Sequence, residues 1–421
     1  MKQFIIIGNS AAGIAAVEAI RKIDRDAKVT VISDEAYPAY CRCLISYYLA
    51  GDVKEDSIIY RPESFYKENN VELLLNKKVS RIDPKKNRVI CADKTQLSYD
   101  SLLIATGSSP KFPEISGIKK TGVFGFRTIK DTRDIAGLVP VTKSAVVLGG
   151  GLIGLKAAYA LKKRHIDVKV IIKSTQVLSQ VLDFEAAELV QKRLEENGIE
   201  VILGQDVSEV IGEEGEIKAV KLDSGKAIAA SLVVVAKGVK PNIDLVKDTE
   251  VKVKEGILSN QNLQSSIPNI YAAGDVAEVF DLTLGESSIN ALWPVAVEQG
   301  KVSGANLSGK TTDYAGSVGM NSLEFFGMPT VSLGIFKTKN PQDYEELKIK
   351  DPKANLYKKL LLKNNYLVGA VLVGDIKNSG VLLRLIRERI DVSSFKEKLL
   401  QENFGFPDIM DLIKDKEQIY V

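Results

Sequence analysis

The chain has 421 residues, of which 45% are hydrophobic and 26% are charged, with 57 Lys and Arg residues against 54 Asp and Glu residues. A net charge of +3 is nearly neutral for this length and argues against a nonspecific nucleic-acid or membrane-surface binding protein. A single histidine, His165, excludes a histidine-rich metal site, so we expect no metal centre. If this chain is an enzyme, a cofactor must carry its chemistry.

The first predicted elements form a strand, a glycine-bearing turn, a helix and a second strand. Residues 3–7 are a short apolar run, 8–13 form the turn, 14–23 have a helical pattern and 28–33 are rich in β-branched residues. This order is typical of a βαβ unit.

The same order of elements returns downstream, where the second turn begins 141 residues after the first, at Gly149. Its strand is predicted over residues 144–148, its helix over 155–164 and its second strand over 168–172. Two such units at this spacing predict an α/β protein with two Rossmann-like dinucleotide-binding domains.

Two further buried strands, at residues 101–105 and 232–236, each run into a segment broken by glycine and proline. A third short strand, 269–273, leads into Gly274 and Asp275, and a helical stretch covers 295–307. Beyond about residue 311 the pattern changes to strands and amphipathic helices, with an Asn364-Asn365 hairpin signal, so we expect a C-terminal α+β domain.

The first turn reads Gly-Asn-Ser-Ala-Ala-Gly. Gly8 allows a tight turn, Gly13 allows the helix to approach the strand, and the N–H groups at the helix start face a pyrophosphate. Asp34 and Glu35 lie 21 and 22 residues past Gly13, where an acid accepts hydrogen bonds from an adenosine ribose. The alternative is that both acids are solvated loop residues. The expected nucleotide contacts within the turn are Gly8, Ser10, Ala11, Ala12 and Gly13.

The second turn, Gly-Gly-Gly-Leu-Ile-Gly, fits the dinucleotide pattern fully, but the acid expected after it is missing. Lys173 and Ser174 lie 19 and 20 residues past Gly154. A cation and a hydroxyl suit a 2′-phosphate, which favours NADPH. In the alternative, Lys173 points to solvent and NADH is bound through other contacts. The expected contacts are Gly149, Gly151, Leu152, Ile153, Gly154 and Lys173.

Three further segments follow in order with these two turns, namely Ala105-Thr106-Gly107, 237–242 and 271–275. Together they make the chain resemble the FAD/NAD-linked pyridine nucleotide-disulfide oxidoreductase superfamily over essentially the whole chain. The resemblance implies FAD and NAD(P)H as cofactors, with Asp275 accepting a hydrogen bond from the ribityl chain of the flavin. It also implies an FAD domain formed by 1–112 and 247–312, an NAD(P) domain at 113–246, and a C-terminal interface domain at 313–421. Further residues assigned to the FAD site by the resemblance are Arg42, Val79, Ala105, Thr106, Gly107, Gly274 and Trp293, and Gly238 is assigned to the NAD(P) site.

The segment 40–51 is similar to two branches of this superfamily. In NADH:rubredoxin reductases, NADH nitrite reductase large subunits and ferredoxin reductases, an arginine at the position of Arg42 contacts the flavin nucleotide. In the coenzyme A-disulfide reductase and NADH peroxidase branch, the redox cysteine stands at the position of Cys43. A thiol near a flavin can be a nucleophile, so Cys43 is the catalytic candidate. The alternative is an inert cysteine. Cys91 lies in a region of strand and turn that we expect to be exposed, and we expect it to be inert.

Three features depart from the family pattern or leave a role open. Lys156 stands where the family commonly has a glutamate near the nicotinamide. The Cys-x4-Cys pair and the C-terminal histidine of the glutathione reductase type are absent. Trp293 is expected beside the flavin, although it could equally pack in the core or at an interface.

We therefore predict an FAD-dependent NAD(P)H oxidoreductase. We expect it to exchange electrons with a small iron–sulfur protein of the rubredoxin or ferredoxin type, or with a partner subunit, because the chain lacks cysteines for a cluster of its own. Alternatives are a thiol-based reductase of coenzyme A disulfide, peroxide or oxygen that uses Cys43, and a flavin-binding interaction protein. Three cysteines do not form a secreted disulfide framework, and no apolar run reaches the roughly 18 residues of a membrane span, so we expect a cytoplasmic protein, either monomeric or a homodimer.

Overall fold

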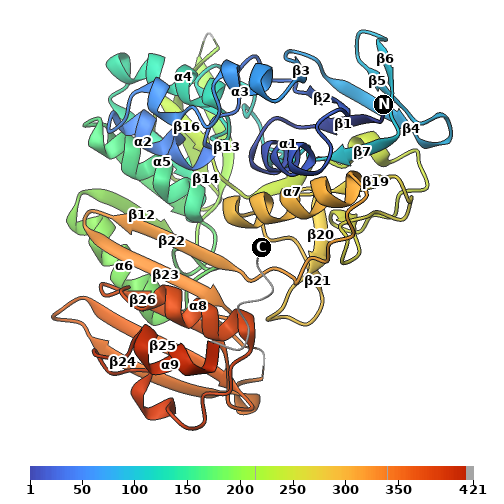
Figure 1. The fold of residues 1–421 in the computed structure, drawn as a ribbon. Coiled ribbons are helices and arrows are strands. Elements are labelled where there is room, and N and C mark those ends of the chain that lie inside the picture. Colours follow the sequence, from blue (N-terminus) through green and yellow to red (C-terminus); the bar gives the residue numbers. More distant parts are fainter. Residues whose placement is uncertain (214, 339, 414–421) are drawn as a thin grey trace.

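The computed structural model describes residues 1–213, 215–338 and 340–413. Two parallel sheets lie side by side in the upper part of the molecule, and an antiparallel C-terminal sheet lies below them (Figure 1). This arrangement confirms the predicted fold class of two Rossmann-like units with a C-terminal α+β unit. The domain boundaries at residues 112, 246 and 312 stay predictions.

The first sheet combines strands from both ends of the nucleotide-binding region. Its order is β19-β7-β1-β2-β3, and all its pairs are parallel. Four strands come from the first part of the chain, and the edge strand β19 joins them after the second unit is complete. The strands are β1 (Gln3–Ile7), β2 (Lys28–Ile32), β3 (Val71–Leu74), β7 (Ser101–Ile104) and β19 (Ile270–Ala272).

Helix α1 (Ala11–Ile23) packs against α7 (Trp293–Leu307), below α1 in Figure 1. Both helices belong to one apolar cluster, in which Ile14, Val17 and Ile20 are fully buried. Helix α1 begins three residues before the predicted position, because Ser10 is already the extended residue that precedes the helix. The turn therefore occupies fewer residues than the glycine pattern indicates.

The second sheet has the order β12-β11-β10-β16-β9 and is also entirely parallel. Its central strands β10 and β16 are almost completely buried because helices or other chain segments cover both faces. The elements are β9 (Val123–Phe124), β10 (Ser144–Leu148), β11 (Asp167–Ile172), β12 (Ile199–Leu203) and β16 (Leu232–Val235), with α4 (Ile129–Leu138), α5 (Leu152–Lys163) and α6 (Phe184–Glu196).

The two glycine- and proline-broken segments cross between the units as an antiparallel pair, β8 (Ser108–Pro110) with β17 (Val239–Pro241). Asn242 stabilises the place where the two segments cross, through hydrogen bonds with Thr106. Its Nδ2 donates to the carbonyl of Thr106 at 2.9 Å, and the Thr106 hydroxyl donates to the carbonyl of Asn242 at 2.9 Å. These bonds hold the backbone around Gly107 in place.

The C-terminal sheet is antiparallel, in the order β22-β23-β26-β25-β24. Asn364 and Asn365 both have positive φ, as a two-residue hairpin turn requires, so the predicted hairpin is confirmed. The charged edge strand β24 escaped prediction because its side chains are mostly exposed. The elements are β22 (Met320–Phe325), β23 (Met328–Gly334), β24 (Glu345–Asp351), β25 (Leu356–Lys363), β26 (Tyr366–Val373), α8 (Ser379–Glu388) and α9 (Phe406–Ile413).

Smaller elements complete the described chain. Cys91, which the sequence suggested to be exposed, is buried in β5. No described helix combines the length and the apolar character needed to cross a bilayer. The remaining elements are α2 (Ile45–Ala50), α3 (Glu63–Glu68), β4 (Val79–Asp83), β5 (Arg88–Cys91), β6 (Gln96–Ser98), β13 (Val207–Glu213), β14 (Glu216–Leu222), β15 (Ala227–Ala229), β18 (Ile257–Leu258), β20 (Ala277–Phe280) and β21 (Ser287–Ser288).

Candidate active site

A cavity of about 970 Å³ lies at the carboxyl ends of the strands of the first sheet. Its wall includes Gly8 after β1, Ser33 after β2, Ala105 after β7 and Ala273 after β19. Open α/β sheets bind nucleotides at this edge, and the volume lies at the upper end of the range for ligand pockets. The cavity can therefore hold a ligand as large as a dinucleotide.

One stretch of the wall is the first turn, where Ser10, Ala11 and Ala12 meet the cavity. The Ser10 side chain makes no capping hydrogen bond with α1, which leaves the N–H groups of the first helical turn free to bind an anion. Gly8 has a φ of +125°, and a Cβ at this position would lie 2.1 Å from the carbonyl oxygen of Ala105. Gly13 does not line the cavity. A Cβ on Gly13 would lie 2.0 Å from the carbonyl oxygen of Gly8, so the glycine allows the helix to pack closely against the preceding strand.

The two acids predicted to bind the adenosine ribose both line the cavity, but they differ in their partners. Asp34 is exposed. Glu35 forms an ion pair with Arg42 and accepts a hydrogen bond from the Tyr40 hydroxyl at 2.6 Å. Glu35 therefore has a structural partner, and Asp34 is the acid more available to a ribose. Val79, in β4, also lies on the wall.

Arg42 connects the first unit to the segment that leads into the second. Besides Glu35, it donates to the Tyr40 hydroxyl at 2.9 Å and to the carbonyl of Arg127 at 3.2 Å. The Tyr40 hydroxyl also accepts the backbone N–H of Ile129, the first residue of α4, at 3.0 Å. Arg42 lies on the cavity wall, within a network that fixes the position of α4, and its contact with the flavin nucleotide stays a prediction.

On another part of the wall, Asp275 lies with Thr106, Gly107 and Gly274. Its Oδ2 accepts the Ser108 hydroxyl at 2.8 Å and forms an ion pair with Arg127. A carboxylate has a second oxygen that can accept a ligand hydroxyl. Arg127 carries no sequence pattern that marks it as a binding residue. The only local signal beside it is the Thr128-x-x-Asp131 capping box, which marks the start of α4 and not a binding residue.

Trp293 lies on the cavity wall at the start of α7. Its ring meets that of Tyr60 edge to face, with the centroids 5.1 Å apart and an angle of 88° between the planes. Trp293 therefore lines the cavity and also packs against Tyr60, while its place beside the flavin stays a prediction.

Cys43 lines the cavity, and Cys41 is half-buried beside it. The hydrogen-bonding Cys43 thiol, together with the backbone N–H groups of Cys43 and Leu44, lowers the pKa of Cys41 to about 6. The same interaction with Cys41, aided by burial, raises the pKa of Cys43. The hydrogen-bonded pair therefore favours one thiolate near neutral pH. The assignment of the reactive thiol to Cys43 stays a prediction.

The second turn repeats the backbone of the first but meets the cavity at one residue, Ile153. Gly149 has a φ of +117°, and a Cβ there would lie 2.4 Å from the carbonyl oxygen of Ala236. Lys173 is exposed at the end of β11, and Gly238 has a φ of +87° before β17. The predicted NAD(P) contacts that lie outside the cavity lining are Gly149, Gly151, Leu152, Gly154, Lys173 and Gly238.

Lys156, the unexpected residue after the second turn, points to a junction of three elements. Its Nζ donates to the Tyr47 hydroxyl of α2 and to the carbonyl of Glu324 in β22, both at 3.2 Å. It also lies over the rings of Tyr47 and Phe325. The ammonium group thus joins α5 to α2 and the C-terminal sheet.

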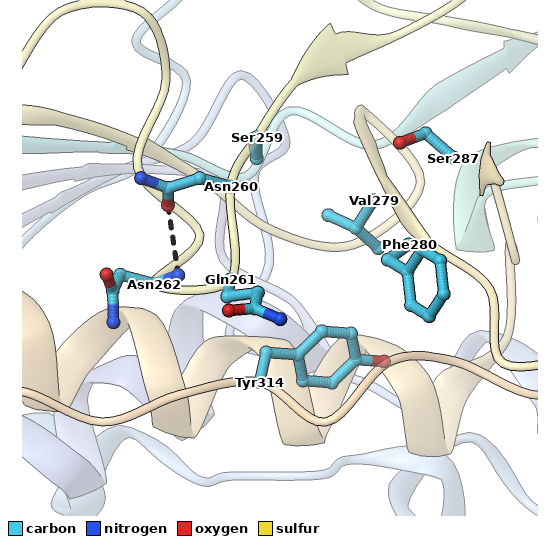
Figure 2. A pocket seen from close by; sticks show the side chains of 8 residues that line it. All are labelled: Ser259, Asn260, Gln261, Asn262, Val279, Phe280, Ser287 and Tyr314. Atoms are coloured by element: carbon cyan, nitrogen blue, oxygen red, sulfur yellow. Dashed lines mark hydrogen bonds between the residues drawn. The ribbon is translucent and has the colours of Figure 1, made fainter. Parts of the chain in front are cut away.

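A second recess, of about 410 Å³, lies between the loop before β19, the β20–β21 hairpin and the segment after α7. Figure 2 shows the Asn260 side chain turned to the backbone of Asn262, with Tyr314 below them and Phe280 across the recess. The Asn260 oxygen accepts the N–H of Asn262 at 2.9 Å. The described residues of this recess carry no full charge at neutral pH, so the large cavity is the candidate active site.

Comparison with known proteins matches residues 2–300 to the pyridine nucleotide-disulphide oxidoreductase family and residues 320–390 to the rubredoxin NAD⁺ reductase C-terminal domain. An NADH oxidase of Methanocaldococcus jannaschii is 41% identical over 72% of this chain and 70% of its own length. A nitrite reductase [NAD(P)H] of Bacillus subtilis is 35% identical over 93% of this chain, which spans only 48% of that protein.

Among solved structures, an NAD-dependent persulfide reductase from A. fulgidus superimposes with a TM-score of 0.86, at 29% identity, over 93% of this chain and 77% of that one. The fold, the nucleotide turns and these matches agree. The chain belongs to the pyridine nucleotide-disulphide oxidoreductase family and is an NAD(P)H-dependent flavin oxidoreductase that uses FAD.

Proposed function

We propose that this protein transfers electrons between a nicotinamide nucleotide and a small iron–sulfur protein of the rubredoxin or ferredoxin type, or an equivalent partner subunit. The observation that carries the proposal is the location of Ile153 on the wall of the large cavity. Ile153 belongs to the second turn, so a nucleotide bound there would lie next to one bound at the first turn. Bound FAD supplies hydride acceptance from a nicotinamide and the release of single electrons to a metal centre.

The described residues divide the binding of the two nucleotides between them. The N–H groups at the start of α1 would bind the FAD pyrophosphate, Asp34 the adenosine ribose, and Asp275 a hydroxyl of the ribityl chain. Arg127 holds the Asp275 carboxylate in place. The second turn would bind NAD(P)H, with Lys173 at its ribose or 2′-phosphate.

The match of residues 320–390 to the rubredoxin reductase C-terminal domain supports an iron–sulfur acceptor. The test is stopped-flow reduction of the FAD-loaded protein by NADH and NADPH, followed by mixing with rubredoxin or ferredoxin. We expect rapid flavin bleaching and reoxidation by at least one carrier at a rate comparable to that with ferricyanide. Reoxidation by ferricyanide alone would contradict the proposed acceptor.

A thiol-based reaction is the second candidate, and the position of Cys43 on the cavity wall favours it. The similarity to a persulfide reductase points in the same direction. Replacing Cys43 with Ser distinguishes the two candidates, with Cys91→Ser in the buried β5 strand as the control. If electron transfer to rubredoxin and ferredoxin collapses in Cys43→Ser while flavin content is retained, the assignment of electron transfer to a non-thiol site is wrong. A long-wavelength thiolate-to-flavin band during NAD(P)H titration would support the same conclusion.

We also infer a cytoplasmic location, because Cys41, Cys43 and Cys91 are all free thiols and a reducing compartment preserves such thiols. The choice between a monomer and a homodimer stays a prediction. Size-exclusion chromatography with light scattering on the FAD-loaded protein decides it.

A further inference from the structure

Helix α6 of the second unit lies against the C-terminal sheet (Figure 1). The chain enters α6 through the loop 173–182, which begins with Lys173 and Ser174 at the end of β11. The contacts on α6 therefore bear directly on the segment expected to face the ribose of the nicotinamide nucleotide.

Asp183 stands at the junction between this loop and α6, and its two carboxylate oxygens have different partners. Oδ1 accepts the backbone N–H of Ala186 at 3.1 Å and so caps α6. Oδ2 accepts the Tyr357 hydroxyl at 2.7 Å and pairs with the Lys359 ammonium at 2.8 Å, both from strand β25. One carboxylate thus joins the helix start to the C-terminal sheet.

This junction is nearly closed to solvent. Tyr357 is fully buried, and the side chains of Lys359 and Asp183 are only 12% and 14% exposed. Such an ion pair is far less screened than a surface pair and strongly constrains the groups that form it. Nearer to solvent, Glu185 binds Lys348 at 2.8 Å and Lys350 at 3.1 Å.

A short series of hydrogen bonds continues from this junction to Ser174. The carbonyl of Leu182, next to Asp183, accepts the Gln176 side-chain amide at 3.1 Å. The carbonyl of Gln176 accepts the Ser174 hydroxyl at 2.8 Å. The loop is thus bonded internally from its α6 end to its β11 end.

The loop also forms a hydrogen bond with the second turn and packs into the apolar core. The N–H of Leu178 donates to the carbonyl of Gly150 at 2.8 Å. Val177, Leu178 and Leu182 are buried in the same apolar cluster as Tyr357. The C-terminal sheet, the loop and the second turn therefore pack as one body.

We propose that Tyr357 and Lys359 of the C-terminal sheet are positioning residues for the nicotinamide nucleotide, acting through Asp183 and the 173–182 loop. The proposal rests on the assignment of that loop and the second turn to NAD(P)H. Neither side chain belongs to the cavity lining, so their effect is on the affinity for the nucleotide and not on the electron-transfer step.

Steady-state kinetics of the FAD-loaded Tyr357→Phe and Lys359→Met variants test this, with ferricyanide as acceptor so that the natural acceptor does not matter. We expect KM for the preferred nucleotide to rise roughly three- to tenfold, with kcat within about twofold and flavin content unchanged. Calorimetric titration with the oxidised nucleotide should give the same factor in Kd. Lys396→Met is the matched control, because Lys396 pairs with Glu345 within the C-terminal region at 2.9 Å.

A double-mutant cycle tests whether Tyr357 acts through the hydrogen bonds of the 173–182 loop. If Gln176 and Tyr357 act through the same loop, Tyr357→Phe combined with Gln176→Leu should raise Kd by less than the product of the single effects. Gln191→Leu is the control partner, because Gln191 bonds only Glu195 along the exposed face of α6 among its described hydrogen bonds. With Gln191→Leu the effects should multiply.

Hydrogen exchange should also quicken in residues 173–182 of Tyr357→Phe but not in Lys396→Met. Unchanged KM and Kd in both Tyr357→Phe and Lys359→Met would overturn the proposal, as would a fully multiplicative cycle with Gln176→Leu. Lys173→Ala and Gly149→Ala together separate this failure from a wrong nucleotide assignment. If both of them also leave Kd unchanged, the assignment of the loop and the second turn to NAD(P)H is wrong. If either changes Kd while Tyr357→Phe and Lys359→Met do not, only the role of the C-terminal sheet is wrong.

Discussion

The two glycine turns are nearly identical in backbone and different in surroundings. Gly8 and Gly149 both have positive φ, and a Cβ on either would lie within 2.4 Å of a carbonyl oxygen on a neighbouring segment. The first turn opens into a large cavity with Asp34 and Glu35 nearby, whereas the second reaches that cavity through Ile153 and is followed by exposed Lys173. The spacing of the glycines thus builds nearly the same turn twice, and the residues around the two turns make their surroundings different.

The largest effects are expected when the first glycine of each turn is replaced with alanine, in two separate variants. Gly8→Ala and Gly149→Ala both introduce a Cβ where only glycine fits, because the backbone is left-handed and in close contact. We expect Gly8→Ala to be purified with at least roughly tenfold less flavin per protein, and Gly149→Ala to keep its flavin but to be reduced poorly by NAD(P)H. Flavin absorbance and stopped-flow reduction measure the two effects. Loss of flavin in both variants would show that the turns are not independent.

The next effect concerns the Arg127–Asp275 ion pair, which has no counterpart among the described contacts of the second turn. Replacing Arg127 with Met leaves a mostly buried carboxylate without its cation, at a cost of about 1–3 kcal/mol. We expect faster FAD release, by roughly tenfold or more, measured by fluorescence on dilution. Arg133→Met is the control, because its ion pair with Glu55 is more exposed. Equal FAD release in the two variants would contradict a role for Arg127 in the flavin site.

A smaller effect should follow from reversing the charge after the second turn. Lys173→Glu restores an acid of the kind found after the first turn, which suits a ribose diol and repels a 2′-phosphate. We expect the ratio of kcat/KM for NADPH to that for NADH to fall by about tenfold. The control is Lys169→Glu on the same strand, whose wild-type side chain pairs with Glu200. An unchanged ratio would mean that Lys173 points to solvent.

The smallest effect concerns the thiols of Cys41 and Cys43, which have no counterpart near the second turn among the described residues. Because the thiolate is the reactive form and the pKa of Cys41 is lowered to about 6, its alkylation rate should rise with pH around 6 and level off above about 7. Cys43→Ala should shift that midpoint toward the ordinary value of about 8.5. Buried Cys91, whose pKa is raised by burial, serves as the internal reference in mass spectrometry after iodoacetamide treatment. An unshifted midpoint would show that Cys43 does not stabilise the Cys41 thiolate.

Sequence patterns predicted the elements well where the structure depends on neighbours in the chain. The strands β1 and β10, both turns and the Asn364-Asn365 hairpin are of this kind. The predictions were wrong where tertiary packing decides whether a side chain is buried. Cys91 lies beside a turn and seemed exposed, but the β4–β5–β6 sheet buries it.

The sequence by itself determined the two dinucleotide-binding turns, because glycine spacing between a strand and a helix fixes local backbone geometry. The tertiary structure alone decided which side chains complete the sites. Arg127 meets Asp275 across 148 residues, and Tyr357 meets Asp183 across 174. Such pairs carry no periodic or local signal, since they form only when separate sheets pack together. The same packing turned Lys156 toward α2 and the C-terminal sheet.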